Sequence, residues 1–202
     1  SAFKDGLFEV QDAGSQKIAE FLEVKPGMRV VDACAGAGGK TLHLAAMMEN
    51  KGQIIAMDIH GWKLTELKRR AKRAGAHNIE TREITDTKVI KRLHEKADRL
   101  LIDAPCSGLG VLKRNPDSKW KIDQDFIDRI KKEQQQILQD YSKIIRKGGK
   151  LVYATCSILP SENNEQVAEF LKNNPDFKLV KDEKVMPSSG FDGFYMALIE
   201  RI

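Results

Sequence analysis

Short apolar runs alternate with longer amphipathic stretches along the chain, and this alternation restricts the possible folds more than any other feature. The short runs are rich in Val, Ile and Leu, which suits strands that are covered on both faces. Strand alternating with helix is typical of an α/β protein with a parallel sheet. We expect strands over residues 28–33, 53–58, 79–84, 98–104, 150–155 and 194–201, and helices over 39–49, 61–74, 124–146 and 162–172.

Local signals predict several helix ends. Asp12 is a suitable N-cap for a first helix that runs to about Val24, because its side chain can accept a backbone N–H of the first turn. Ser161 with Glu162 is expected to open the helix over 162–172. Basic and glycine residues at 147–149 predict that the helix over 124–146 ends there.

Length and composition describe an ordinary globular protein. The 202 residues suffice for a single domain with a sizeable core. Apolar residues make up 41% and charged residues 31%, and no apolar run is long enough to cross a membrane. The chain has no signal-peptide pattern, and it begins with Ser1 rather than Met, as a processed chain or a fragment of a longer protein would. The net charge of +5 fits nucleic-acid binding without requiring it.

Cysteine and histidine usage argues against a disulfide framework and against a metal site. The three cysteines, Cys34, Cys106 and Cys156, form no CxxC pair. We therefore expect a reducing, cytoplasmic setting. The four histidines lack the spacing of metal ligands, and we expect no bound metal.

The distinctive motifs lie where the expected strands end, which is where open α/β sheets bind ligands. A glycine-rich loop over 32–41 (DACAGAGGKT) follows the first strand, and Asp58 ends the second. This pairing is typical of a nucleotide-cofactor site, in which the carboxylate holds the ribose hydroxyls. Asp86, after the third strand, is placed either to bind the adenine amine of S-adenosylmethionine or to cap a helix. Two alternatives for the loop are a phosphate-binding P-loop, whose first glycine would stand at Cys34, and simple helix–strand packing.

Two cysteines follow the fourth and fifth strands in turn-forming loops. Cys106 lies in 103–110 (DAPCSGLG), and Cys156 lies in 154–157 (ATCS). If these strands are neighbours in a parallel sheet, both thiols meet at the ligand edge. Cys34 is compatible with a small buried apolar residue, or with a backbone contact to the cofactor.

A thiolate beside a methyl donor suits methylation of carbon 5 of a pyrimidine. Addition of the thiolate to carbon 6 makes carbon 5 nucleophilic enough to take the methyl group. Asp103 is placed to act as an acid near N3, and Lys40 is a candidate cation for lowering the thiolate pKa. A base must then remove the proton on carbon 5. The residues themselves leave open which of Cys106 and Cys156 attacks.

Together these motifs resemble those of the RNA 5-methylcytosine methyltransferases of the Sun/Fmu (RsmB) type. In that family the glycine-rich loop reads DACAAPGGKT, and the cysteine motifs read DAPCSGxG and TCSxxPxEN. The resemblance covers nearly the whole chain in order. The matching segments are 32–41, 103–110, 114–120 (RNPDSKW), 155–163 (TCSILPSEN) and 190–195 (GFDGFY), with Gln11, Asp12 and Ser15 before the sheet.

The resemblance implies a class I, Rossmann-like fold, with a mostly parallel seven-stranded sheet and helices on both faces. It implies S-adenosylmethionine as cofactor and carbon 5 of cytosine in RNA, first of all small-subunit (16S) ribosomal RNA, as substrate. Cys156 matches the nucleophile, and Cys106 matches the cysteine that helps to release the product by assisting proton removal. Asp103 matches the aspartate near cytosine N3, and Lys40 matches the motif lysine near the target base.

The family's cofactor-contacting positions fall on the glycine-rich loop and on three aspartates. One departure is visible, because Gly36-Ala37 stands where the family has Ala-Pro. Without the proline the loop is less restricted when unfolded, so weaker cofactor binding is the expected consequence. The matching positions are Cys34, Ala35, Gly36, Ala37, Gly38, Gly39, Lys40, Asp58, Asp86 and Asp103.

Family members carry an N-terminal RNA-binding domain, so residues 1–202 are expected to be the catalytic domain of a longer protein, acting as a monomer. Basic residues after the Cys106 loop are the expected phosphate contacts, whereas those of the helix over 61–74 are expected to be a solvated face. Trp120 is placed either to stack on a base or to anchor packing. The RNA-binding candidates are Lys113, Arg114, Lys119 and Trp120.

Two alternatives concern the activity. The first is the same chemistry on transfer RNA or on large-subunit ribosomal RNA. The second is a non-catalytic RNA-binding scaffold that keeps the fold. The presence of both Cys106 and Cys156 argues against the scaffold, because a scaffold needs neither thiol.

Overall fold

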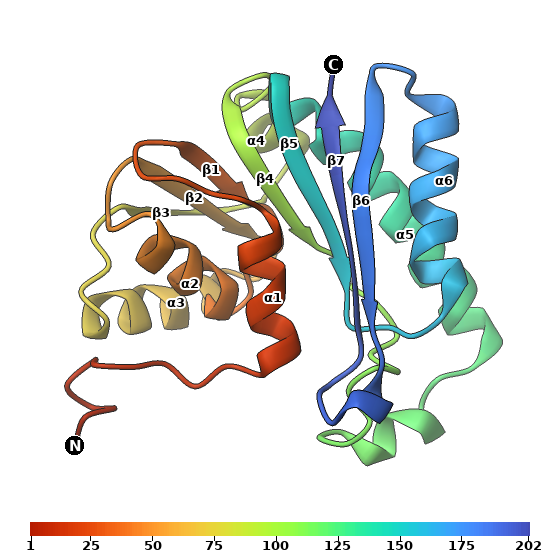
Figure 1. Cartoon of the computed structure of the whole chain (residues 1–202), viewed down its shortest axis with the longest axis horizontal. Coiled ribbons are helices and arrows are strands. Elements are labelled where there is room, and N and C mark those ends of the chain that lie inside the picture. The colour runs from red at the N-terminus through yellow and green to blue at the C-terminus, as the bar shows by residue number, and fades with distance from the viewer.

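Seven strands form one sheet, in the spatial order β3-β2-β1-β4-β5-β7-β6 (Figure 1). The computed structural model describes the backbone of residues 1–202 and every side chain except that of Ser189. β7 runs antiparallel to β5 and β6, and the remaining pairings are parallel. The predicted mostly parallel α/β sheet is therefore confirmed. The strands are β1 (Arg29–Asp32), β2 (Gln53–Asp58), β3 (Ile79–Glu83), β4 (Ala97–Asp103), β5 (Ile145–Thr155), β6 (Phe177–Val185) and β7 (Phe194–Arg201).

Helices cover both faces of this sheet (Figure 1). Successive side chains of a strand point to opposite faces, and they sort here into two cores. Val30 of β1 packs with the first two helices, whereas the next residue, Val31, packs with the last three. The third helix packs against Ala56 of β2 in a smaller cluster. Among the described residues, no helix is both long and apolar enough to span a membrane. The helices are α1 (Ala13–Phe21), α2 (Gly39–Met47), α3 (Gly61–Arg73), α4 (Thr87–Lys91), α5 (Gln124–Tyr141) and α6 (Asn164–Asn173).

The end of the longest helix was predicted wrongly. α5 ends at Tyr141, a short 3-10 turn follows, and β5 already begins at Ile145, so residues 147–149 lie within a strand. The two glycines there allow a bend rather than a helix stop. A Cβ on Gly149 would lie 2.9 Å from the carbonyl oxygen of Arg146 and 3.1 Å from that of Asp98 on β4, so a side chain at this position would crowd the backbone of both strands.

Two elements were not predicted, α4 and β6. α4 has only five residues, and β6 is an edge strand whose side chains are mostly exposed and charged, so neither has an apolar run. The N-cap at Asp12 is confirmed, because its carboxylate accepts the Gly14 N–H at 2.9 Å. α1 ends at Phe21 rather than near Val24, and α6 begins at Asn164, after a 3-10 turn that contains Glu162.

The order of the strands reverses between β1 and β4, which are neighbours although they are distant in sequence. Such a switch point leaves a crevice beyond the carboxyl ends of the two strands, where open α/β sheets bind ligands. The glycine-rich loop follows β1, and Asp103 ends β4. The fold therefore brings the predicted site residues to one edge.

Candidate active site

The glycine-rich loop takes its shape from its glycines and from Asp58. Gly38 has a φ of 88°, and a Cβ there would lie 2.5 Å from Cγ of Leu67, so this position requires glycine. The Asp58 carboxylate accepts the Gly36 N–H at 2.9 Å and the His60 N–H at 2.8 Å. These bonds fix the loop beside the end of β2. Each carboxylate oxygen keeps a further lone pair for another donor.

A cavity of about 350 Å³ opens beyond the ends of β1, β2 and β4. Apolar side chains share its wall with the carboxylates of Asp58 and Asp103, and its size suits a small-molecule ligand. Of the predicted cofactor positions, it is lined by Cys34, Gly36, Asp58 and Asp103, whereas Ala35, Ala37, Gly38, Gly39, Lys40 and Asp86 do not line it.

Asp86 lies beside this cavity and caps a helix. Its carboxylate accepts the Lys88 N–H at 2.7 Å at the start of α4, which is the second of the two roles that we expected. It lines a neighbouring cavity of about 560 Å³, which shares Ile84, Ile137 and Tyr141 with the first. A contact from Asp86 to an adenine amine stays a prediction.

Two buried groups stand at the start of the loop. Burial raises the pKa of Asp32 to about 7, although the Thr41 hydroxyl donates to its carboxylate at 2.7 Å. Burial also raises the pKa of the Cys34 thiol well above its usual range, and nearby carboxylates add to this rise. Cys34 therefore lines the cavity as a neutral thiol, not as a nucleophile.

Lys40 and Asp103 form an ion pair between α2 and the end of β4. The Lys40 ammonium lies 2.7 Å from Oδ2 of Asp103, and both side chains are largely buried. Burial lowers the pKa of Lys40, but attraction to Asp103 and the hydrogen bond outweigh it, so the pKa is raised. The pair thus stabilises the charged form of Lys40.

The two cysteines predicted to meet at the sheet edge do so. β4 and β5 are parallel neighbours, and the sulfurs of Cys106 and Cys156 lie 3.2 Å apart. A hydrogen bond from Cys106 lowers the pKa of Cys156; burial and Asp103 oppose this, and Lys40 supports it. The same bond, together with burial, raises the pKa of Cys106. The arrangement therefore favours a thiolate at Cys156 and a thiol at Cys106.

A buried carboxylate that the sequence analysis did not assign joins the two cysteine loops. Glu162 is fully buried. Its Oε1 accepts the hydroxyls of Ser107 at 2.5 Å and Ser157 at 2.6 Å, and its Oε2 accepts the Ser107 N–H at 2.8 Å. Gln134 on α5 donates to the same Oε2 at 3.0 Å. The motif TCSILPSEN carried this residue, but its pattern did not indicate that the side chain turns inward.

The predicted RNA contacts lie on the segment after the Cys106 loop. Lys113, Lys119 and Trp120 are exposed, and Trp120 is 80% exposed with the Lys119 ammonium 4.9 Å from its ring centroid. Arg114 donates to the buried Asp192 carboxylate at 2.5 Å, so this guanidinium is already engaged within the chain. Trp120 does not anchor packing, and its ring is available for stacking.

A second exposed tryptophan was missed. Trp62, at the start of α3, is 70% exposed, with the Lys63 ammonium 5.7 Å from its ring centroid. His60 and Lys63 also line the cavity at the ends of the strands. The signal available in the sequence was an aromatic residue between a histidine and a lysine, directly after a predicted strand end.

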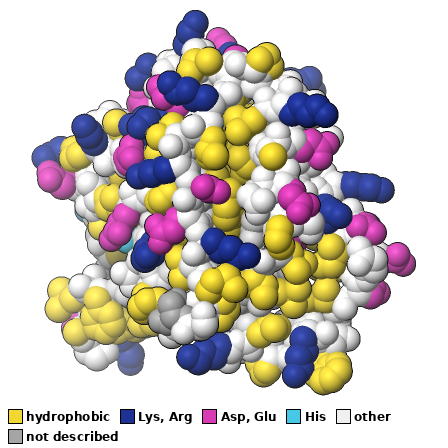
Figure 2. All heavy atoms as spheres, turned by 45° about the vertical axis from the view of Figure 1, so that its right-hand side comes forward, with side chains coloured by type: hydrophobic (Ala, Val, Ile, Leu, Met, Phe, Trp, Pro, Cys, Tyr) yellow, Lys and Arg dark blue, Asp and Glu magenta, His cyan; other side chains and the backbone are white. Residues whose placement is uncertain are grey.

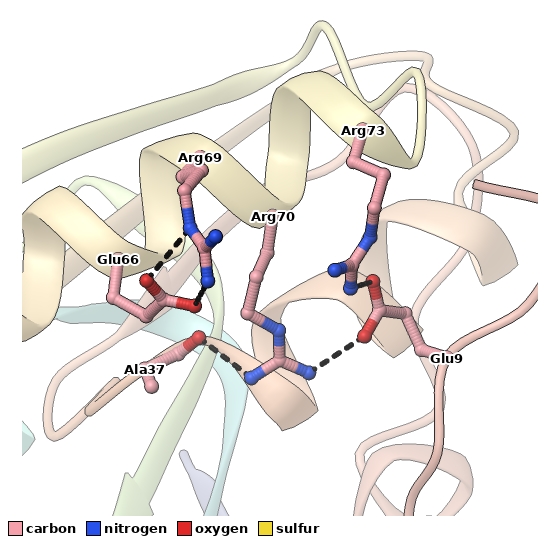
Figure 3. Close-up of polar contacts among 6 residues, drawn as sticks. All are labelled: Glu9, Ala37, Glu66, Arg69, Arg70 and Arg73. Carbon is pink, nitrogen blue, oxygen red and sulfur yellow. Dashed lines mark hydrogen bonds and ion pairs between the residues drawn. The ribbon is translucent and has the colours of Figure 1, made fainter. Parts of the chain in front are cut away.

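An N-terminal segment is connected to the glycine-rich loop through α3 (Figure 3). Arg70 donates to the carbonyl oxygen of Ala37 at 2.8 Å and to the Glu9 carboxylate at 2.9 Å. Arg73 also pairs with Glu9, whereas Arg69 on the same helix bonds only Glu66. We call the chain of contacts Glu9–Arg70–Ala37 the arginine relay. It contradicts the expectation that the basic residues of this helix form only a solvated face.

The positive charge is dispersed on the face shown in Figure 2. Lysine and arginine side chains lie among acidic ones there, and apolar side chains occupy part of the surface between them. The net charge of +5 does not by itself define a nucleic-acid surface on that side. Among the described side chains, no group of three His, Cys, Asp or Glu residues could hold a metal ion.

A switch-point cavity beside a glycine-rich loop, on a seven-stranded sheet with one antiparallel strand, defines a Rossmann-like methyltransferase domain. The model of the 16S rRNA methyltransferase RsmB/F family matches residues 19–199. The chain belongs to this family of S-adenosylmethionine-dependent enzymes.

Individual relatives agree with this assignment. Ribosomal RNA small subunit methyltransferase B of Proteus mirabilis is 36% identical over 98% of the chain and 47% of its own length. The protein of the same name from Klebsiella pneumoniae is 39% identical over 88% of the chain and 41% of its own length. The chain thus spans less than half the length of these curated relatives.

Solved structures show the same fold. NSun6 from Pyrococcus horikoshii, crystallised with the S-adenosylmethionine analogue SFG, is 30% identical, with a TM-score of 0.91 over 100% of the chain and 55% of its own. A methyltransferase homologue from Pyrococcus horikoshii is 28% identical, with a TM-score of 0.87 over 100% of the chain and 70% of its own.

Proposed function

We propose that the chain is the catalytic domain of an enzyme that methylates carbon 5 of cytosine in RNA, with small-subunit (16S) ribosomal RNA as the first candidate. The pair of thiols 3.2 Å apart at the cofactor edge carries this proposal. One thiol is polarised toward a thiolate by the other, and covalent activation of cytosine needs such a nucleophile. The names of the relatives support ribosomal RNA as the substrate class.

The residues around the cavity fit S-adenosylmethionine. The Asp58 carboxylate has lone pairs left for ribose hydroxyls, and Ile84 and Ile137 offer an apolar surface to a purine ring. The Asp103 carboxylate, which also lines the cavity, would hold the amino group of the methionine part. When bound, the cofactor supplies an electrophilic methyl group. Asp86 is proposed to reach the adenine amine from the edge of the neighbouring cavity.

Cys156 is proposed as the nucleophile. Its thiolate adds to carbon 6 of cytosine, and the electron pair that moves into the ring makes carbon 5 reactive toward the methyl group. The Lys40 ammonium, held by Asp103, stands beside this sulfur and lowers its pKa. The Lys40 ammonium, which is the positive end of the ion pair with Asp103, is the proposed source of stabilisation for negative charge that develops at N3.

Cys106 is proposed to act at product release. In the resting site, the bond to Cys156 keeps Cys106 protonated. Once the Cys156 sulfur is bonded to carbon 6, it no longer carries the charge that raises the pKa of Cys106. Cys106 then releases its proton to solvent, and its thiolate takes the carbon 5 proton. The electrons of that C–H bond re-form the double bond between carbons 5 and 6 and expel the Cys156 thiolate.

RNA binding is proposed for the exposed segment after the Cys106 loop. Lys113 and Lys119 would contact phosphates, and Trp120 would stack on a base. Transfer RNA and large-subunit ribosomal RNA are alternative substrates for the same chemistry.

A covalent adduct tests the proposal. The Cys106→Ala variant is incubated with S-adenosylmethionine and unmodified 16S ribosomal RNA, and the products are separated on a denaturing gel. We expect a protein–RNA adduct, because release is blocked after the nucleophile has added. Transfer RNA and 23S ribosomal RNA in parallel reactions identify the substrate class.

The double variant with Cys106→Ala and Cys156→Ala is the control and should form no adduct. An adduct that persists in the double variant would refute Cys156 as nucleophile. Absence of any adduct with all three RNAs, together with absence of cofactor binding by calorimetry, would contradict the proposed function.

A further inference from the structure

Glu162 has an environment that its position in the chain did not suggest. Its side chain is fully buried, and among the described side chains no cation forms an ion pair with it. A buried carboxylate without a cation is costly unless hydrogen bonds satisfy it. Four donor contacts do so: the Ser107 N–H, the hydroxyls of Ser107 and Ser157, and the amide of Gln134.

The donors come from the two loops that carry the cysteines. Ser107 directly follows Cys106, and Ser157 directly follows Cys156. Both hydroxyls bond the same oxygen of Glu162, and they also lie 3.2 Å from each other. One carboxylate therefore holds the two loops at a fixed separation, one residue away from each sulfur.

Further contacts fix Glu162 itself. The Tyr153 hydroxyl on β5 donates to its backbone carbonyl oxygen at 2.8 Å. Gln134 donates to the carbonyl oxygen of Pro105 at 2.9 Å as well as to Glu162, which ties α5 to the residue before Cys106. Because every donor is anchored in a strand, a helix or a cysteine loop, the carboxylate has little room to move.

We propose that Glu162 is a positioning residue that sets the separation of the two sulfurs and thereby places the proton on Cys106 and the negative charge on Cys156. Its catalytic meaning rests on the proposed function; its effect on the thiols does not. The hydrogen bonds that Glu162 accepts from both cysteine loops support its role in setting the separation of the sulfurs. Its negative charge supports its role in placing the proton, since a negative group beside Cys106 opposes ionisation of that thiol.

Apart from Asp103, the groups that face the two sulfurs favour a proton on Cys106 and a negative charge on Cys156. Cys106 faces Glu162 and Cys156, and both of them favour its protonated form. Cys156 faces Cys106, Lys40 and Asp103, of which the first two favour its thiolate. Removing the charge of Glu162 weakens only the preference at Cys106, and releasing the loops weakens the bond between the sulfurs.

The test is the pH profile of alkylation at each cysteine of the full chain. Wild type and the Glu162→Gln variant are treated with iodoacetamide between pH 6 and pH 10, and peptide mass spectrometry gives the rate at each site. We expect Cys156 to react faster than Cys106 in wild type. In Glu162→Gln the ratio of the rates should fall about tenfold, which corresponds to about one pKa unit.

Glu165→Gln is the matched control, because Glu165 is exposed in the first turn of α6 and should leave the profile unchanged. Ser157→Ala is a second test that keeps the buried charge and removes one link, and we expect its rate ratio to fall several-fold. If Glu162→Gln does not fold, the ratio of alkylation rates in Ser157→Ala tests the inference instead. A wild-type profile in a folded Glu162→Gln or, failing that, in a folded Ser157→Ala would overturn the inference.

Alkylation requires neither RNA nor cofactor, so the two proposals can fail separately. A shifted profile, together with no adduct on any of the three RNAs in the Cys106→Ala assay and no cofactor binding, would overturn the proposed function and leave the positioning role standing. An adduct together with an unshifted alkylation profile would support the proposed function and overturn the positioning role of Glu162.

Discussion

The two halves of the candidate site are held in different ways. The cysteine loops are joined through Glu162, a fully buried group with partners on β5, α5 and both loops. The glycine-rich loop is held by Asp58 and by the arginine relay, which reaches a partly exposed N-terminal segment (Figure 3). The atoms proposed to make covalent bonds are thus fixed from inside, and the loop proposed to hold the cofactor is fixed partly from the surface.

The difference predicts unequal energies. Donors left without a partner in the interior each cost about 1–3 kcal/mol, whereas an ion pair contributes little net free energy because the loss of solvation offsets its attraction. Substitutions on the cysteine side should therefore change stability and reactivity strongly. Substitutions in the relay should change mainly the affinity for the cofactor.

The largest expected effect is that of Glu162→Ala. Truncation removes the acceptor of four buried donor contacts and leaves a cavity, so the free energy of unfolding should fall by about 3–5 kcal/mol. Urea denaturation followed by circular dichroism measures it. Glu165→Ala, on an exposed position nearby, should stay within about 0.5 kcal/mol of wild type. If the free energy of unfolding falls by less than about 1 kcal/mol in Glu162→Ala, the cysteine loops are not held more strongly than the glycine-rich loop.

Asp32 tests whether the base of the cofactor loop behaves as an interior site. Its pKa is raised to about 7 in the folded chain, so the stability linked to its bound proton is complete below pH 4 and is lost as the pH rises through 7. Asp32→Asn removes this dependence. Between pH 4 and pH 8 the variant should gain about 4 kcal/mol relative to wild type, measured by urea denaturation. A constant difference across that range would contradict the buried, protonated group.

Cys106→Ala should slow alkylation of Cys156. The hydrogen bond from Cys106 is the largest cause of the lowered pKa of Cys156, and its loss moves that pKa upward. At pH 7 the rate with iodoacetamide should fall about tenfold. Cys34→Ala serves as the control and should leave the rate at Cys156 unchanged. An equal or faster rate in Cys106→Ala would show that Cys106 does not donate to Cys156.

The smallest change in stability is expected for Arg70→Lys, which tests how the arginine relay holds the glycine-rich loop. A lysine cannot hold both the Ala37 carbonyl and the Glu9 carboxylate with one geometry. Stability should change by less than about 1 kcal/mol, while the Kd for S-adenosylmethionine should rise about threefold to tenfold by calorimetry. Arg69→Lys, which alters only the exposed bond to Glu66, should bind the cofactor normally. If both variants bind S-adenosylmethionine with the same Kd, the arginine relay does not contribute to cofactor binding.

Structural features that depend on a few neighbouring residues could be predicted from the sequence. Apolar runs located the strands that build the core, and the glycines and aspartates at their ends located the sheet edge where the cavity lies. β6 was missed because an edge strand needs no apolar run, and the end of α5 was misplaced because glycines also serve bent strands. The role of Glu162 was out of reach, because contacts between residues distant in sequence decide whether a carboxylate turns inward.

Sharing one acceptor has a consequence for how this chain can change. Ser107 and Glu162 are 55 residues apart, yet neither can be exchanged without leaving the other's hydrogen bonds unmet. The same holds for Ser157. The three positions can therefore change only together. A cysteine loop taken from a relative would keep these hydrogen bonds only if it carries a donor that reaches the Glu162 carboxylate.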